Sequence, residues 1–262
     1  MFFSWASFMN LKFKTMPFIK TSIKLLVTCF LHSSCKVMLL NHALKKYGIY
    51  ETQAEVKMIE GADKHIAFIP MHHIGKREFY NSIKQVSDSL QNKGYSIFYE
   101  TIIIPEYLSK QEEITYRKKI RKIMRTDATT YLDTINNLFM GKHKLPRGVE
   151  LVNQPANDKL YDVAYAKNID VYLDSLVIKF ENRYGEVVLS ECDLNSPYPS
   201  ENHNCEYLSR DLSKAFMEEF AQDYRNRHIA EKVMKTKNNK IAIFYGSAHY
   251  SGLMELLSTN EE

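Results

Sequence analysis

Two short apolar runs in this chain each end in histidine. The first, 66–71, leads into His72 and His73, and the second, 241–248, leads into His249. Their length and composition predict buried strands. In open α/β sheets, ligands bind at the carboxyl ends of the parallel strands. Because neighbouring parallel strands bring these ends together, we expect the histidines to share one site although they are far apart in the sequence.

The segments between these runs predict a mostly parallel α/β sheet. A strand at 66–70, a helix at 77–92 and a strand at 95–100 have the spacing of a βαβ unit with a right-handed crossover. A long helix at 208–235 then precedes the last strand, 240–245. We therefore predict a sheet built from two βα halves with flanking helices, and a site at the carboxyl-terminal strand ends.

Apolar spacing and turn residues predict the other parts of the chain. Residues 36–63 are expected to form an N-terminal helix, ended near Gly48, and a linker, and residues 64–262 a single α/β domain. Further elements are expected as helices at 107–140, 170–184 and 251–258, short strands at 149–152 and 186–190, and a loop at 193–206.

The N-terminal segment has the features of an export signal. Residues 1–34 hold four lysines and no acidic residue or arginine. These lysines precede an apolar stretch at 25–31, small residues and then Cys35, which is the layout of a bacterial lipoprotein signal. We therefore predict that residues 1–35 are a signal and that a lipid anchors the mature protein to the membrane of a bacterial cell envelope. An uncleaved membrane anchor and a cytosolic amphipathic helix are the alternatives.

The same lysines account for the net charge of the chain. The whole sequence carries a formal charge of +4, and removing the four lysines gives +4 − 4 = 0. A neutral body provides no electrostatic argument for nucleic acid, so no nucleic-acid partner is expected. A dense basic run remains at 117–125. We interpret it as a solvated helix face, with contact to anionic lipid as the alternative.

Two of the four cysteines, Cys192 and Cys205, lie at the predicted loop. In an oxidising envelope they could form a disulfide. Two free thiols are an equally weighted alternative. The chain has no Cys-x-x-Cys motif, so neither a zinc ribbon nor thioredoxin chemistry is indicated.

The predicted sheet edge gathers groups that can do chemistry. His72 and His73 follow the first strand, Glu100 ends the second and His249 ends the last. Two imidazoles and a carboxylate could bind a divalent metal. They could equally supply a general base and a general acid without a metal. Histidines at strand ends are also common as satisfied structural groups, so the pattern alone leaves these interpretations open.

Two arginines lie on the helix before the last strand. Arg225 and Arg227 are two positions apart, which puts them on different helix faces, so at most one faces the site. An inward guanidinium could bind a substrate carboxylate or an oxyanion, and we assign that role to Arg225. Ser247 does not lie in a Gly-x-Ser-x-Gly motif, and the sequence has no phosphate loop or dinucleotide fingerprint.

Together these residues resemble a known group of proteins. The matching segments are 68–73, the strand that ends in Glu100, 224–226 and 245–253. They resemble the TraB/TIKI group, which belongs to a wider superfamily with erythromycin esterases and ChaN-type haem-binding lipoproteins. That group is marked by two Gly-x-x-His motifs, a glutamate after the first and an arginine on the helix before the second. Pro70 stands where the first glycine of the early motif belongs.

The resemblance places the site on His73, Glu100, Arg225 and His249. TIKI-like members are implied to be metal-dependent proteases that use manganese or cobalt, and zinc is a further candidate here. The implied ligands are His73, His249 and Glu100, with His72 as an alternative. Esterase members are implied to use a histidine base without metal, and ChaN-like members bind haem.

We therefore expect an envelope-anchored, metal-dependent hydrolase that acts on a peptide or an ester. His73 and His249 are expected as metal ligands or bases, Glu100 as a third ligand or the general base, and Arg225 as the group that stabilises the oxyanion. The alternatives are a haem- or metal-binding lipoprotein without catalysis, and a degenerate non-catalytic module, which Pro70 suggests.

Overall fold

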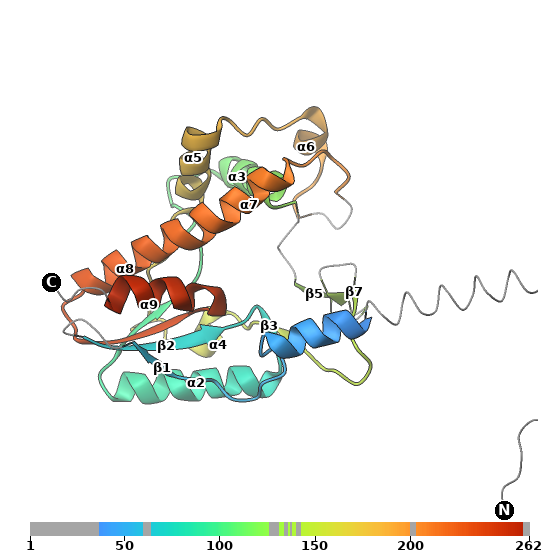
Figure 1. Cartoon of the computed structure of the whole chain (residues 1–262). Coiled ribbons are helices and arrows are strands. Elements are labelled where there is room, and N and C mark those ends of the chain that lie inside the picture. Colours follow the sequence, from blue (N-terminus) through green and yellow to red (C-terminus); the bar gives the residue numbers. More distant parts are fainter. Residues whose placement is uncertain are drawn as a thin grey trace, which may run out of the picture.

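The computed structural model describes residues 37–59, 64–125, 131–133, 136, 138–139, 143–199 and 203–258. In these residues the chain forms a five-stranded sheet in the order β1-β2-β10-β4-β9, with helices on both faces (Figure 1). The last strand of the sequence therefore lies at the centre. The strands of this sheet are β1 (Lys57–Ile59), β2 (His65–Met71), β4 (Ser96–Tyr99), β9 (Lys167–Asn168) and β10 (Lys240–Gly246).

Four of these five strands run parallel. β10 pairs in parallel with β2 and with β4, and β4 pairs in parallel with β9, whereas β1 is antiparallel to β2. Gly246 lies opposite Met71, and Phe244 lies opposite Tyr99, so β2, β10 and β4 end at the same edge of the sheet. The predicted mostly parallel α/β fold is thus confirmed. β1 was missed because it lies in the expected linker.

The two faces of the sheet are covered by different helices. Along β10, Ile241 and Ile243 join the apolar cluster that contains residues of α8 (Arg225–Lys235) and α9 (Tyr250–Ser258). Ala242 and Phe244 join the cluster of α2 (Arg77–Asn92) and α4 (Asn157–Leu160) on the opposite face (Figure 1). Because alternate side chains point to opposite faces, a strand covered on both sides must be apolar throughout, as the two runs are.

A second group of helices packs around its own apolar cluster, which includes Ile123, Phe180, Phe216 and Phe220. It lies at the top of Figure 1, away from the sheet. A continuous helical segment runs from this group onto the sheet, as predicted for 208–235. Its elements and their neighbours are α3 (Lys110–Met124), α5 (Leu173–Tyr184), α6 (Glu191–Asn195), α7 (Arg210–Ala215) and the π-helix η1 (Phe216–Tyr224), which continues into α8.

The prediction of one helix over 107–140 is wrong beyond its first half. α3 ends at Met124, because Arg125 takes a left-handed conformation with φ +64° and terminates the helix. Very short strands follow, which apolar spacing does not reveal. They are β3 (Ile74–Gly75) paired with β8 (Val152–Asn153), and β5 (Leu132–Asp133), β6 (Leu138–Phe139) and β7 (His143–Lys144) in a separate small sheet.

The predicted strand at 186–190 is also wrong. Val187 is buried in the helical group, but the segment pairs with no strand among the described residues. Ser190 instead starts α6 through a capping box, in which it accepts from the Asp193 backbone N–H and Asp193 accepts from its own. The capping residues therefore determine that this segment leads into a helix and not a strand. The helix extends into the start of the predicted loop 193–206.

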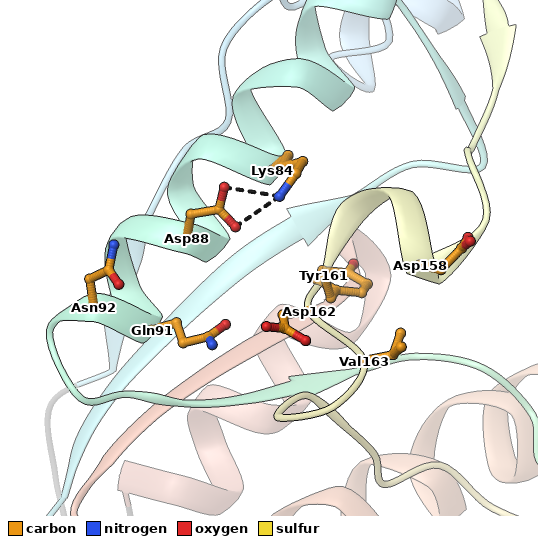
Figure 2. A pocket seen from close by; sticks show the side chains of 8 residues that line it. All are labelled: Lys84, Asp88, Gln91, Asn92, Asp158, Tyr161, Asp162 and Val163. Atoms are coloured by element: carbon orange, nitrogen blue, oxygen red, sulfur yellow. Dashed lines mark hydrogen bonds and ion pairs between the residues drawn. The ribbon is translucent and has the colours of Figure 1, made fainter.

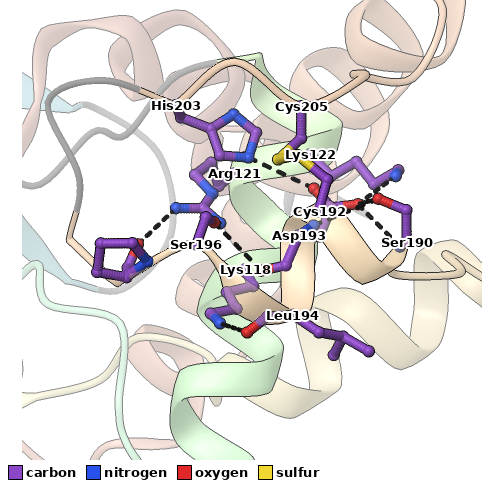
Figure 3. The surroundings of a disulfide bond; sticks show 11 residues. Lys118, Arg121, Lys122, Ser190, Cys192, Asp193, Leu194, Ser196, His203 and Cys205 are labelled. Carbon is purple, nitrogen blue, oxygen red and sulfur yellow. Dashed lines mark hydrogen bonds and ion pairs between the residues drawn. A yellow bond between two sulfur atoms is a disulfide. The ribbon is translucent and has the colours of Figure 1, made fainter.

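The prediction that the basic run 117–125 forms a solvated helix face is wrong at three positions. Lys118, Arg121 and Lys122 are buried on α3. Lys118 and Arg121 donate to backbone carbonyls of the segment 190–199, and Lys122 donates to the Asp193 carboxylate (Figure 3). A lipid contact is equally wrong for these three side chains. Their charge holds an irregular segment of the protein against α3.

Cys192 and Cys205 form a disulfide, with an S–S distance of 2.02 Å (Figure 3). The bond joins α6 to the chain that returns toward α7. Of the two alternatives that the sequence allowed, the disulfide is the one found, and it ties the same segment that the basic side chains hold.

The N-terminal part of the chain is described from residue 37 onward, and the predicted signal, residues 1–35, lies outside the described residues. Residues 37–46 are helical, and Gly48 with φ +72° follows the helix, as expected. Among the described residues, no helix combines the length and the apolar character needed to cross a membrane.

Candidate functional site

A buried arginine lies at the centre of the predicted site. Arg225 is the first residue of α8 and directly follows the π-helix, and its guanidinium faces the end of β4. Its Nε and Nη2 donate to the two carboxylate oxygens of Asp170 at 2.9 and 2.6 Å, and Nη2 also donates to Glu100 Oε1 at 2.6 Å. The buried cation is therefore paired with two carboxylates, and such pairing is needed because an unpaired buried charge is strongly destabilising.

All five N–H groups of Arg225 have a partner. Nη1 completes the set, since it donates to the Ala221 carbonyl at 3.4 Å and lies 3.3 Å from Nε2 of His249. The predicted role of this guanidinium as the oxyanion donor is therefore not supported by its contacts. Arg227, by contrast, is exposed, as its position on another face of the helix predicted.

Glu100 follows β4 and reaches across to the end of β10. Its Oε2 accepts a hydrogen bond from the Gly246 backbone N–H at 2.5 Å. A Cβ at Gly246 would lie 3.1 Å from that oxygen, so glycine leaves the room that the carboxylate uses. Burial alone would raise the pKa of Glu100, but Arg225, His249 and the Gly246 N–H outweigh it and hold this pKa below its usual value. Glu100 is thus ionised at neutral pH, and 17% of its side chain is exposed.

His249 follows β10 in a 3-10 turn and is buried. Its Nδ1 lies 2.6 Å from Oδ1 of Asn226, and its Nε2 faces the Arg225 guanidinium. Because a guanidinium only donates, Nε2 must accept, and the ring proton is therefore assigned to Nδ1. Burial lowers the pKa of His249, and the nearby Glu100 offsets this only in part. The imidazole is thus neutral at neutral pH.

His73 is the exposed member of the site. It follows β2, and its ring stacks on Tyr131 at a centroid distance of 4.3 Å. Loss of water on the covered side lowers the pKa of His73, the Glu100 carboxylate acts to raise it, and Arg225 acts to lower it. The ring is therefore neutral at neutral pH and lies within the field of the ionised pair.

His72 lies in a different environment from His73. Its ring packs near Phe79, at a centroid distance of 5.2 Å, and its Nε2 is 3.6 Å from the position that a Cβ on Gly48 would take. Successive side chains of an extended segment point to opposite sides, which separates the two histidines. His72 is thus directed toward the N-terminal helix.

Of the predicted residues, the structure brings Glu100, Arg225 and His249 into one hydrogen-bonded network. Asp170 and Asn226 also belong to it, and we call these five residues the sheet-edge network. His73 lies at its open rim. Sequence reasoning missed four residues of the site, and of these Asn226 and Tyr245 carried a signal, because both lie in the matching segments 224–226 and 245–253. The four are Asp170, Asn226, Tyr131, which stacks on His73, and Tyr245, which packs edge-on against His249.

The residues do not fit the metal that the resemblance implies. His249 Nε2 and Glu100 Oε1 lie 3.8 Å apart, but both atoms contact the Arg225 guanidinium. A divalent cation bound by both would stand against that positive charge. Within the described part of the chain, ligand atoms of His73, Glu100 and His249 also do not gather within 4.8 Å of one another.

Another group in the described residues could hold a metal. Ligand atoms of Asp193, His203 and Cys205 lie within 4.8 Å of one another (Figure 3). However, the Cys205 sulfur is in the disulfide with Cys192, and a disulfide sulfur is a poor ligand because the thiolate is the form that binds metals. The group does not indicate which metal it would prefer.

A pocket of about 550 Å³ lies beside α2 and α4 (Figure 2). Its wall includes the ion pair of Lys84 with Asp88, at 3.0 Å, and the side chains of Tyr161 and Asp162. None of the predicted site residues lines it. The pocket and the candidate site are therefore lined by different residues.

Comparison of this chain with protein-family models, with curated proteins and with solved structures gives no match. The resemblance to the TraB/TIKI group therefore stays a prediction that depends on the motif residues.

Proposed function

We propose that the protein is a metal-independent hydrolase of peptides or esters in which His73 is the general base. The observation that carries this proposal is that Arg225 and the Gly246 N–H hold Glu100 as a carboxylate at the open sheet edge, where its negative charge acts on the neutral, exposed ring of His73. A neutral histidine beside a carboxylate is the arrangement that general-base catalysis near neutral pH requires.

The reaction follows from these roles. His73 removes a proton from a water molecule as the water oxygen bonds to the substrate carbonyl carbon. The imidazolium that forms is stabilised by the charge of Glu100. His73 then returns the proton to the leaving oxygen or nitrogen as the ester or amide bond breaks. Arg225 acts here as a positioning residue for Glu100, and His249 as a positioning residue for Arg225.

We also propose the finer features that the motifs imply. These are membership of the TraB/TIKI group, an arrangement of two βα halves around the site, and an envelope location through a lipidated N-terminus. The first two are supported by the motif residues at the ends of β2, β4 and β10, and the third by the lysines, the apolar stretch 25–31 and Cys35 of the N-terminal sequence. The proposal does not extend to the metal dependence of TIKI-like proteins, because the Arg225 guanidinium contacts both Glu100 Oε1 and His249 Nε2. No contact among the described residues favours the haem-binding alternative.

A pair of histidine variants tests the proposal. His73→Gln in the full chain is expected to lower the hydrolysis rate on a panel of peptide and ester substrates by about 10²-fold or more, which is the usual contribution of a general base. The neighbouring His72→Gln is the matched control and should retain activity, since its ring points away from the network. Equal activity of the His73 variant and the wild type would overturn the proposal.

A further inference from the structure

We infer that Asn226, held against Gly252, is the positioning residue that fixes the tautomer of His249 and so keeps Arg225 on Glu100. The geometric part of this inference is independent of catalysis, whereas its consequence for activity depends on the proposed function. Asn226 is buried on α8 beside Arg225, and its Oδ1 lies 2.6 Å from Nδ1 of His249.

Gly252 makes room for this side chain. It lies in α9, where glycine is an unfavourable helix residue. A Cβ at this position would lie 2.3 Å from Nδ2 and 3.3 Å from Cγ of Asn226. Because real Cβ atoms do not approach other atoms so closely, alanine at 252 must displace the amide of Asn226. Glycine at this position thus allows α8 and α9 to approach closely around the Asn226 side chain.

The tautomer of His249 matters because of what faces its other nitrogen. Nε2 lies 3.3 Å from Nη1 of Arg225, which can only donate. If the ring proton were on Nε2, two donors would face each other, and the guanidinium would lose one of its five partners. An acceptor at Nδ1 prevents this, since it retains the proton on the far side of the ring. Asn226 therefore controls Arg225 through His249.

This arrangement requires a hydrogen-bond acceptor in the side chain of residue 226. An aspartate in its place keeps an acceptor for the Nδ1 proton, whereas a leucine of similar size removes it. Gly252→Ala removes the acceptor by a different route, since it displaces Asn226 without changing it. Ser251→Ala is the matched control, because Ser251 is exposed on the same helix next to Gly252.

The experiment is nitrogen NMR of the histidine rings in the full chain at neutral pH, with His249 assigned by comparison with His249→Gln. We expect a protonated Nδ1 and an unprotonated Nε2 in the wild type, in Ser251→Ala and in Asn226→Asp. Asn226→Leu and Gly252→Ala should shift His249 to the Nε2-protonated or a mixed form.

A wild-type ring that carries its proton on Nε2, or is doubly protonated, would overturn the inference even if the variants did not fold. An unchanged Nδ1 tautomer in both Asn226→Leu and Gly252→Ala would also overturn it. Because no substrate is needed, these results are separate from the fate of the proposed hydrolase. If the hydrolase is active, Asn226→Leu should lose activity and Asn226→Asp should restore part of it.

Discussion

Two regions of the molecule bury basic side chains, and they do so differently. In the helical group, Lys122 donates to the Asp193 carboxylate, and Lys118 and Arg121 donate to backbone carbonyls of the segment that contains Asp193. We call these four residues the α3–α6 cluster. In the sheet-edge network, Arg225 donates mainly to side chains.

The difference is the reason why we assign a structural role to the α3–α6 cluster and propose a chemical role for the sheet-edge network. The α3–α6 cluster satisfies carbonyls that would otherwise lack partners in an irregular segment, and a disulfide secures the same segment. The sheet-edge network instead joins ionisable groups that follow β4, lie on α8 or follow β10. Glu100 in the network and His73 at its rim reach solvent. Buried charge at the edge of a parallel sheet is where chemistry is expected.

The largest effect should come from removing the cation of the sheet-edge network. Arg225→Met leaves the buried Asp170 carboxylate and Glu100 without their common partner. We expect a loss of about 3–5 kcal/mol in the free energy of unfolding, as for other buried ion pairs broken on one side. Arg121→Met in the α3–α6 cluster should lose about 1–3 kcal/mol, because it leaves mainly neutral acceptors unsatisfied. Urea unfolding of both variants measures the difference, and equal losses would remove the distinction between the two regions.

The disulfide should have an intermediate effect that is confined to the helical group. Replacing Cys192 and Cys205 by serine opens a loop with a sequence separation of 13, and we expect the free energy of unfolding to fall by about 3 kcal/mol. The hydrolysis rate of the folded variant should not change, because the bond lies outside the sheet-edge network. If circular dichroism shows that the variant keeps the fold but its hydrolysis rate is lower than that of the wild type, the two regions are coupled.

The smallest effect should be a dependence of stability on pH. Burial lowers the pKa of His249 below its usual 6.5, so the unfolded chain binds a proton more readily than the folded one. The stabilising contribution is therefore present above about pH 6.5 and is lost as the pH falls through the lowered folded value.

This loss can be measured as the free energy of unfolding at about pH 7 and about pH 5, where we expect a decrease on the order of 1 kcal/mol from this residue. His249→Gln should flatten that slope. The exposed His42→Gln is the control and should leave the slope as in the wild type. A slope that is unchanged by His249→Gln would contradict the assignment of a buried, neutral His249.

The sequence predicted the parts of the fold that follow from strong apolar periodicity. Residues 66–69 and 241–245 are buried between the two helical layers, so their composition identified β2 and β10. His73 and His249 followed from where those two strands end, and Glu100 followed from the end of β4. Helical spacing predicted that Arg225 and Arg227 lie on different faces of the helix, and the resemblance placed Arg225 in the site.

The parts that were missed depend on contacts distant in sequence or on single capping residues. The buried carboxylate of Asp170 has its charge partner, Arg225, 55 positions away in the sequence. The burial of Lys122 depends on Asp193, and the end of α3 depends on the left-handed Arg125. Neither periodicity nor composition predicts such contacts. They also do not predict that the Arg225 guanidinium contacts both Glu100 and His249, which is the contact that argues against the expected metal.

The measurement that tests the account most directly is hydrolysis by the full chain after treatment with a chelator, with and without added manganese, cobalt or zinc. Metal content is determined by mass spectrometry on the same samples. The account predicts an unchanged rate in the chelator and no stoichiometric metal, because Arg225 takes the position between Glu100 and His249. A rate that disappears with the chelator and returns with one bound equivalent of metal would contradict it.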